Sequence, residues 1–97
     1  MRIKQLNHRD ATGSGFTDYL NVDITENELR DIFGTSWGPS SDGKVTIEWV
    51  VWIDGVLCTI YDWKGHRWHV GSKGEFRQDA PELVREAIAE HRDRAAR

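Results

Sequence analysis

The sequence predicts one α+β domain over residues 1–97, with a three- or four-stranded antiparallel sheet, a short N-terminal helix and a longer C-terminal helix. The first indication is the segment "VTIEWVVWIDGVLCTIYDW", in which two runs rich in Val, Ile, Trp and Tyr flank Asp54-Gly55. Such runs are typical of β-strands, and Asp-Gly favours a two-residue hairpin turn. The second indication is a pair of helix-capping signals, each followed by apolar residues at helical spacing.

The N-terminal region has weaker signals. Residues 1–8 are consistent with a short strand, and residues 9–18 are rich in Gly, Ser, Asp and Thr, which predicts a flexible loop. Leu20, Val22 and Ile24 alternate with polar residues, so an extended segment is expected there.

Both predicted helices begin at a capping box. Thr25 and Glu28 form the first, and Gly34 ends a helix that buries Leu29, Ile32 and Phe33. Asp79 and Glu82 form the second. The apolar stripe of the second helix consists of Leu83, Val84, Ala87, Ile88 and His91, and its exposed side carries the i,i+4 pairs Glu90–Arg94 and Asp93–Arg97.

The predicted strands cover residues 44–53, 56–63 and 67–70, with a second turn at Gly65-His66. A two-residue turn at Asp54-Gly55 pairs Ile53 with Val56 and Trp49 with Ile60. Because side chains alternate along a strand, one face then forms a complete apolar surface for the helices to cover. Its members are Val45, Ile47, Trp49, Val51, Ile53, Val56, Cys58 and Ile60.

The opposite face is also apolar, although a half-solvated antiparallel sheet normally shows polar residues there. With a turn at Gly65-His66, Trp63 faces Trp68 and Tyr61 faces Val70. An apolar patch with aromatic anchors is typical of a protein interface. The alternative is that the last helix or residues 1–24 cover this face. The candidate partner-binding residues are Trp52, Leu57, Tyr61, Trp63 and Trp68.

Composition argues against several classes of function. The net charge of −3 offers no basic footprint for nonspecific nucleic-acid binding. Cys58 is the only cysteine, which excludes an internal disulfide and a thiolate metal cage and favours a reducing compartment. We expect no signal peptide and no membrane-spanning segment.

Two patterns in the sequence suggest a catalytic alternative: a metal-dependent nuclease site and a zinc site. Asp62-Trp63-Lys64 spells the D-x-K pattern of metal-dependent nucleases, but strand alternation places Glu48 on the face opposite Asp62. His66 and His69, with Cys58 and Asp62, resemble a zinc set, yet their odd spacing turns the two histidines to opposite faces unless the turn re-aims one of them. We expect His69 to pair across the strands with Asp62 instead, and we expect no catalytic residue, metal or cofactor.

A third alternative is single-strand binding. Bases would stack on Trp52, Trp63 and Trp68, with Lys64, Arg67 and Lys73 beside the phosphates. The acidic balance of the chain disfavours this interpretation, so nucleic acid is an unlikely partner.

Residues 19–71 resemble a group of small, mostly uncharacterised proteins of tailed bacteriophages. The shared features are a helix ending in Phe-Gly, a Lys-Val-x-x-Glu-Trp strand, an Asp-Gly hairpin and a Thr-Ile-Tyr-x-Trp-Lys strand. The matching residues are Phe33, Gly34, Lys44, Val45, Glu48, Trp49, Asp54, Gly55, Thr59, Ile60, Tyr61, Trp63, Lys64 and Gly71. An extra Trp37-Gly38 before Pro39 departs from the pattern and puts shared specificity in doubt.

The resemblance implies a phage product acting in the cytoplasm of an infected bacterium, but it brings no established activity. Combined with the aromatic face, it predicts a non-enzymatic accessory protein that binds another protein. The expected partner is a second copy in a homodimer, a host factor or a bacterial defence component. The alternative is a nucleic-acid-linked protein, either a single-strand binder or a small metal-dependent nuclease.

Overall fold

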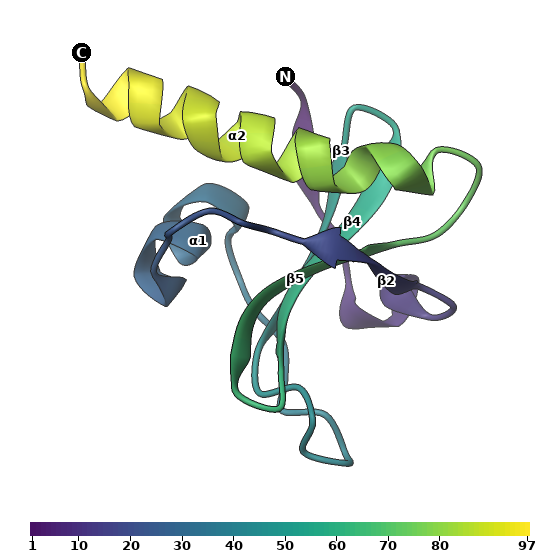
Figure 1. Cartoon of the computed structure of the whole chain (residues 1–97). Coiled ribbons are helices and arrows are strands. Elements are labelled where there is room, and N and C mark those ends of the chain that lie inside the picture. The colour runs from purple at the N-terminus through teal and green to yellow at the C-terminus, as the bar shows by residue number, and fades with distance from the viewer.

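The computed structural model describes residues 1–97 and confirms the predicted α+β class. Its antiparallel sheet has five strands in the order β1-β3-β4-β5-β2, rather than three or four (Figure 1). The strands are β1 (Ile3–Gln5), β2 (Gly15–Tyr19), β3 (Glu48–Ile53), β4 (Val56–Trp63) and β5 (His66–Ser72). The helices are α1 (Glu26–Phe33) and α2 (Ala80–Ala95), with 3₁₀ turns η1 (His8–Ala11) and η2 (Arg77–Asp79).

The β3–β4 hairpin has the predicted register. Ile53 pairs with Val56, and the ladder continues to Glu48 and Tyr61. Asp54 and Gly55 have φ values of 47° and 94°, the left-handed values of a tight hairpin turn. The prediction made from Asp-Gly is therefore confirmed.

The β4–β5 hairpin differs from the prediction. Its turn residues are Lys64 and Gly65, with φ values of 50° and 84°, so Trp63 pairs with His66. Tyr61 pairs with His69, which leaves Arg67 and Trp68 opposite the single residue Asp62 in a β-bulge. The changed turn and the bulge move Trp68 to the helix-covered face, so its predicted position is wrong.

The prediction of a loop over residues 9–18 is also partly wrong. Within and just after that range, β2 forms a strand that pairs with β5 at one edge of the sheet. At the other edge β1 pairs with β3, which confirms the short strand predicted in residues 1–8. β2 itself contains an irregularity between Phe16 and Asp18. Most of its residues are exposed, so they follow no apolar alternation that sequence reasoning would detect.

Both helices cover one face of the sheet, and α2 crosses the strands (Figure 1). Side chains from this face and from both helices form a single apolar core. Its members are Leu20, Ile24, Leu29, Phe33, Ile47, Trp49, Val51, Ile53, Val56, Cys58, Ile60, Trp68, Val70, Ala80, Val84, Ala87 and Ile88. Of the predicted core face, only Val45 lies outside the core, half-buried beyond the start of β3.

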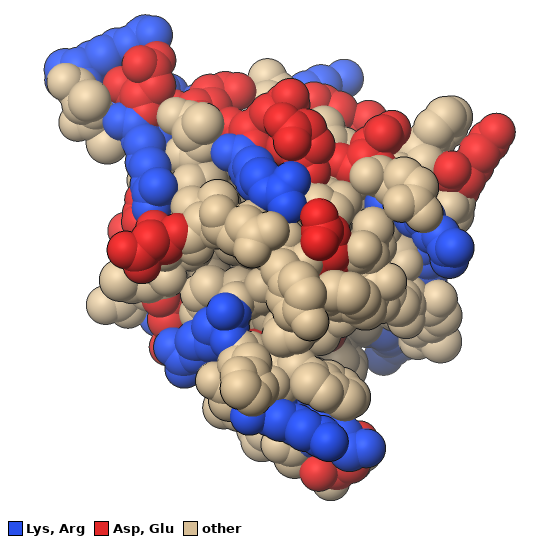
Figure 2. Space-filling view, viewed as in Figure 1, with Lys and Arg blue, Asp and Glu red and all other residues tan.

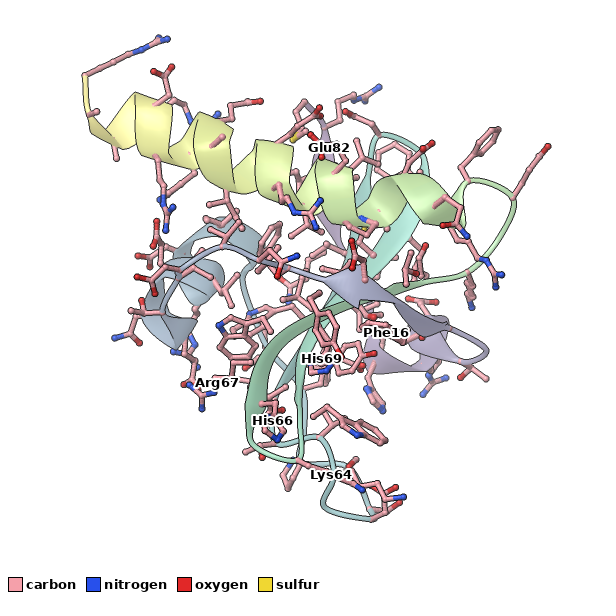
Figure 3. All side chains as sticks on the ribbon, viewed as in Figure 1. Phe16, Lys64, His66, Arg67, His69 and Glu82 are labelled. Atoms are coloured by element: carbon pink, nitrogen blue, oxygen red, sulfur yellow. The ribbon has the colours of Figure 1, made fainter.

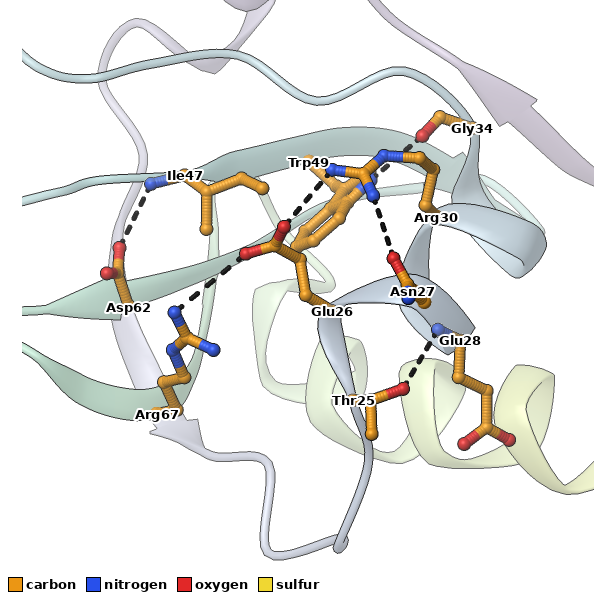
Figure 4. A network of polar contacts seen from close by, with 10 residues as sticks. All are labelled: Thr25, Glu26, Asn27, Glu28, Arg30, Gly34, Ile47, Trp49, Asp62 and Arg67. Carbon is orange, nitrogen blue, oxygen red and sulfur yellow. Dashed lines mark hydrogen bonds and ion pairs between the residues drawn. The ribbon is translucent and has the colours of Figure 1, made fainter.

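The late start of β3 has a local cause. The Asp62 carboxylate is buried, and its Oδ1 accepts a hydrogen bond from the backbone amide of Thr46 at 2.8 Å. The same oxygen accepts a second one from the Ile47 amide at 3.1 Å (Figure 4). These amides are thereby satisfied without a strand partner. The strand predicted from residue 44 consequently begins at Glu48.

The first capping signal is confirmed in part and the second is not. Thr25 Oγ1 accepts a hydrogen bond from the Glu28 amide at 3.1 Å (Figure 4), whereas Asp79 makes no capping hydrogen bond. Instead, α2 continues directly from η2 and has Pro81 in its first turn. No helix is long and apolar enough to cross a lipid bilayer.

Candidate functional site

The sheet face opposite the helices is covered only in its middle. Val50 and Thr59 are fully buried there, and the Leu6 amide donates a hydrogen bond to the Val50 carbonyl at 2.8 Å. The following turn η1 packs against β3. Part of residues 1–24 therefore covers this face. The other predicted cover, the last helix, does not, because α2 lies on the opposite face of the sheet.

This cover divides the predicted aromatic patch into two parts. Trp52 and Leu57 pair with each other near β1, whereas Tyr61 pairs with Glu48 four residues further along the hairpin. Four residues of extended chain separate the two pairs by about 13 Å. Tyr61 and Trp63 lie at the second location, beside an open hollow.

The hollow has a volume of about 500 Å³. Three exposed aromatic side chains, Phe16, Tyr19 and Trp63, form part of its lining. The full lining is Ser14, Gly15, Phe16, Tyr19, Val45, Glu48, Thr59, Tyr61, Trp63 and His69. These residues come from β2 to β5 and the segments that precede β2 and β3, so the tertiary fold assembles the site.

Four aromatic rings pack together along one side of the hollow. The His69 ring stacks on Tyr61 with centroids 5.4 Å apart and an interplanar angle of 24°. Phe16 and Tyr19 lie 5.5 Å and 5.0 Å from the same imidazole, and Figure 3 shows Phe16 next to His69. Pairing of His69 with both Tyr61 and Tyr19 in the sheet places these rings together.

Gly71 allows the backbones of β2 and β5 to pack closely at the edge of this cluster. A Cβ atom there would lie 2.5 Å from Thr59 Oγ1 and 2.9 Å from the Gly15 carbonyl oxygen. Because both distances are shorter than ordinary van der Waals contact, a larger residue would push β2 away from β5.

The hollow contains one carboxylate, that of Glu48. Only 16% of this side chain is exposed, and the carboxylate lies 3.2 Å from Nδ1 of His8. Burial raises the pKa of Glu48, and the nearby His8 opposes that shift. Burial and the Glu48 charge together raise the pKa of Tyr61. At neutral pH, Tyr61 is therefore a neutral phenol.

His69 is a neutral member of the lining. Burial, followed by the influence of His66, lowers the pKa of His69 below its usual value of 6.5. The side chain is 8% exposed, and its Nδ1 atom has no hydrogen-bond partner. An unpaired buried nitrogen carries the full cost of losing its contact with water.

The five predicted partner-binding residues separate into three groups. Tyr61 and Trp63 line the hollow, and Trp52 and Leu57 form the separate pair near β1. Trp68 lies in the core, where its Nε1 donates to the Ile24 carbonyl at 3.1 Å and its ring meets Trp49 edge-on.

Four aromatic or ionisable residues of the lining were not among the predicted partner-binding residues: Phe16, Tyr19, Glu48 and His69. Glu48 was considered only as a nuclease acid, and His69 only as a zinc ligand or a partner for Asp62. Phe16 lies in the loop expected over residues 9–18, and Tyr19 directly follows that loop. Their aromatic side chains were the only sign in the sequence that they belong to a binding site, because the irregularity in β2 breaks the alternation of a regular strand.

The structure gives the candidate catalytic residues other roles. Asp62 points to the helix-covered side, where it binds backbone amides, whereas Glu48 lines the hollow on the other side. The predicted pairing of Asp62 with His69 is wrong, because His69 pairs with Tyr61. Cys58 is buried, and burial raises the pKa of its thiol to about 12. No three His, Cys, Asp or Glu side chains are grouped to hold a metal ion.

Comparisons of the chain with protein-family models, curated proteins and solved structures find no match. The resemblance to phage proteins therefore stays a prediction. The geometry of the hollow is the remaining basis for inferring a function.

Proposed function

We propose that the protein is a small non-enzymatic accessory protein of a tailed phage that acts in the host cytoplasm. In this proposal it binds another protein through the hollow on the open face of its sheet. The observation that carries the proposal is the combination of exposed Phe16, Tyr19 and Trp63 with the recessed Glu48 carboxylate. Exposed aromatic anchors around a concave, mostly apolar site are typical of specific binding surfaces.

A protein partner suits these rings because aromatic side chains are enriched at the centres of interfaces. Phe16, Tyr19 and Trp63 are 53%, 54% and 39% exposed, so each has substantial area to bury against a partner. Trp52 and Leu57 offer a second apolar contact on the same face, beyond η1. A partner that spans both would bury a larger area than the hollow provides alone.

The substitution Trp63→Arg should weaken partner binding at least tenfold while leaving the protein folded. Trp63 is exposed, so the folded protein loses little packing, but the interface loses an aromatic anchor. The measurement is a pull-down from host lysate with tagged protein, followed by mass spectrometry and affinity measurement on the captured partner. Circular dichroism checks the fold.

Phe76→Arg is the matched control, because Phe76 is a 59% exposed aromatic residue outside the hollow. It should retain full capture. Capture that survives Trp63→Arg, or that both variants lose equally, would contradict the proposal. Light scattering distinguishes a second copy from a different partner, since a homodimer dependent on Trp63 would appear without lysate.

Single-strand nucleic-acid binding is the second candidate, favoured by the charge at one end of the molecule. Lys44, Lys64 and Arg67 are exposed at or near the β4–β5 turn, and the Lys44 ammonium lies 5.7 Å from the Trp63 ring centroid. Figure 2 shows lysine and arginine side chains at this tip beside an acidic one, whereas several acidic side chains, interspersed with basic ones, lie over α2 at the opposite end. Trp63 would supply a surface for base stacking.

Incubation with single-stranded and duplex DNA, with and without Mg²⁺, tests this candidate. We expect no cleavage and only weak association, because Glu48 repels phosphate from the hollow and the net charge is −3. Tight binding of single strands that falls steeply with salt, and that is lost in Trp63→Arg, would instead support nucleic acid over protein.

A further inference from the structure

We infer that the hollow accepts the guanidinium group of an arginine side chain that the partner protein presents. This inference rests on the proposed function and adds the chemistry of the group that enters the site. It depends on three features of the lining: its carboxyl group, its flat aromatic walls and its hydrogen-bond acceptors.

The charge of the lining favours a cation. Glu48 carries the only carboxyl group in the lining, and its contact with His8 opposes the rise that burial causes in its pKa. One oxygen of this carboxyl lies 3.2 Å from Nδ1 of His8, whose side chain is 61% exposed. A guest cation would offset the cost of keeping this carboxylate away from water. A carboxylate or phosphate guest would be repelled.

The aromatic walls favour a flat cation over a compact one. A cation is attracted to the face of an aromatic ring, and the planar guanidinium can also stack on it. The hollow offers the rings of Tyr61, Trp63, Tyr19 and Phe16. A lysine ammonium would satisfy the charge of Glu48 but could not stack.

The hydrogen-bonding groups match the donors of arginine. A guanidinium carries five N–H donors in a fixed plane and binds a carboxylate through two of them. Glu48 supplies such a carboxylate, and the neutral His69 ring in the same lining has one acceptor nitrogen. One planar group can therefore satisfy both the charge and the stacking surface.

The test is an NMR titration of the full chain with N-acetyl-arginine amide, with N-acetyl-citrulline amide as the uncharged isostere. Arginine should shift the Tyr61, Trp63 and His69 signals saturably, with a dissociation constant on the order of a few millimolar. Citrulline should bind at least fivefold more weakly, and the corresponding lysine amide should lie between them.

Two variants with matched shape locate the binding. Glu48→Gln should weaken arginine binding at least fivefold, whereas Glu82→Gln, in the acidic cluster on α2, should leave it unchanged. If Glu48→Gln does not fold, His8→Ala gives the second test. It removes the group that competes for Glu48 and should tighten arginine binding about twofold or more.

Equal binding of arginine and citrulline, an unchanged affinity in Glu48→Gln, or shifts confined to the α2 cluster would each overturn the inference. The proposed function would survive those results if partner capture still depended on Trp63. Conversely, arginine binding could require Glu48 while partner capture is independent of Trp63. That pair of results would support the inferred guanidinium site and contradict the proposed function.

Discussion

Trp68→Arg should lower the free energy of unfolding by at least about 4 kcal/mol, whereas Trp63→Arg should leave it nearly unchanged. Trp68 is 6% exposed, packs against Trp49 and donates a hydrogen bond to the Ile24 carbonyl. The substitution removes a large core side chain and places an unpaired charge among apolar residues. Together these effects cost at least about 4 kcal/mol. That is a large part of the 5–15 kcal/mol typical of a domain's free energy of unfolding.

Urea denaturation followed by circular dichroism measures both variants. Trp68→Phe is the intermediate control, because it keeps an apolar ring but loses the indole hydrogen bond, and it should cost about 1–2 kcal/mol. If Trp68→Arg is as stable as Trp63→Arg, then both side chains lie on the open face. That result would restore the register predicted from a turn at Gly65-His66 and contradict the β-bulge.

Asp62→Ala should lower the free energy of unfolding by about 3 kcal/mol. The buried carboxylate accepts hydrogen bonds from the amides of Thr46 and Ile47, and alanine would leave both donors without this partner. Hydrogen bonds to a charged group contribute more than neutral ones, and an unpaired buried donor carries the full desolvation cost. The effect should appear as a lower urea midpoint and as faster hydrogen exchange at these two amides.

Asp62→Asn separates this structural role from the nuclease alternative. The asparagine keeps one acceptor oxygen, so it should cost only about 1 kcal/mol. A nuclease that uses Asp62 would lose its activity in both variants. Mg²⁺-dependent DNA cleavage by the wild type that disappears in a stable Asp62→Asn variant would show that the carboxylate is catalytic.

The parts of the fold that sequence reasoning predicted correctly depend on neighbours in the chain. Asp54-Gly55 sets its own turn, and that turn determines which residues of β3 and β4 face each other. Thr25 caps α1 through an amide three residues away. Such local signals can be recognised in the sequence alone, because they do not depend on contacts with distant segments.

The errors concern distant contacts. Asp79 resembles a cap but makes no capping hydrogen bond, because the chain already turns into α2 through η2. The bulge opposite Asp62 changes the face of every later residue in β5, including Trp68 and His69. A shift of one residue has this effect because side chains alternate with a period of two.

The candidate site shows the same division. The sequence by itself determined the β3–β4 register, the core face around Trp49 and the placement of Tyr61 and Trp63 on the opposite face. Only the tertiary structure decided that Phe16 and His69 lie beside these residues. It also decided that η1 separates Trp52 and Leu57 from the hollow. The physical reason is that local turns set alternation along a hairpin, whereas bulges and edge strands depend on the packing of distant segments.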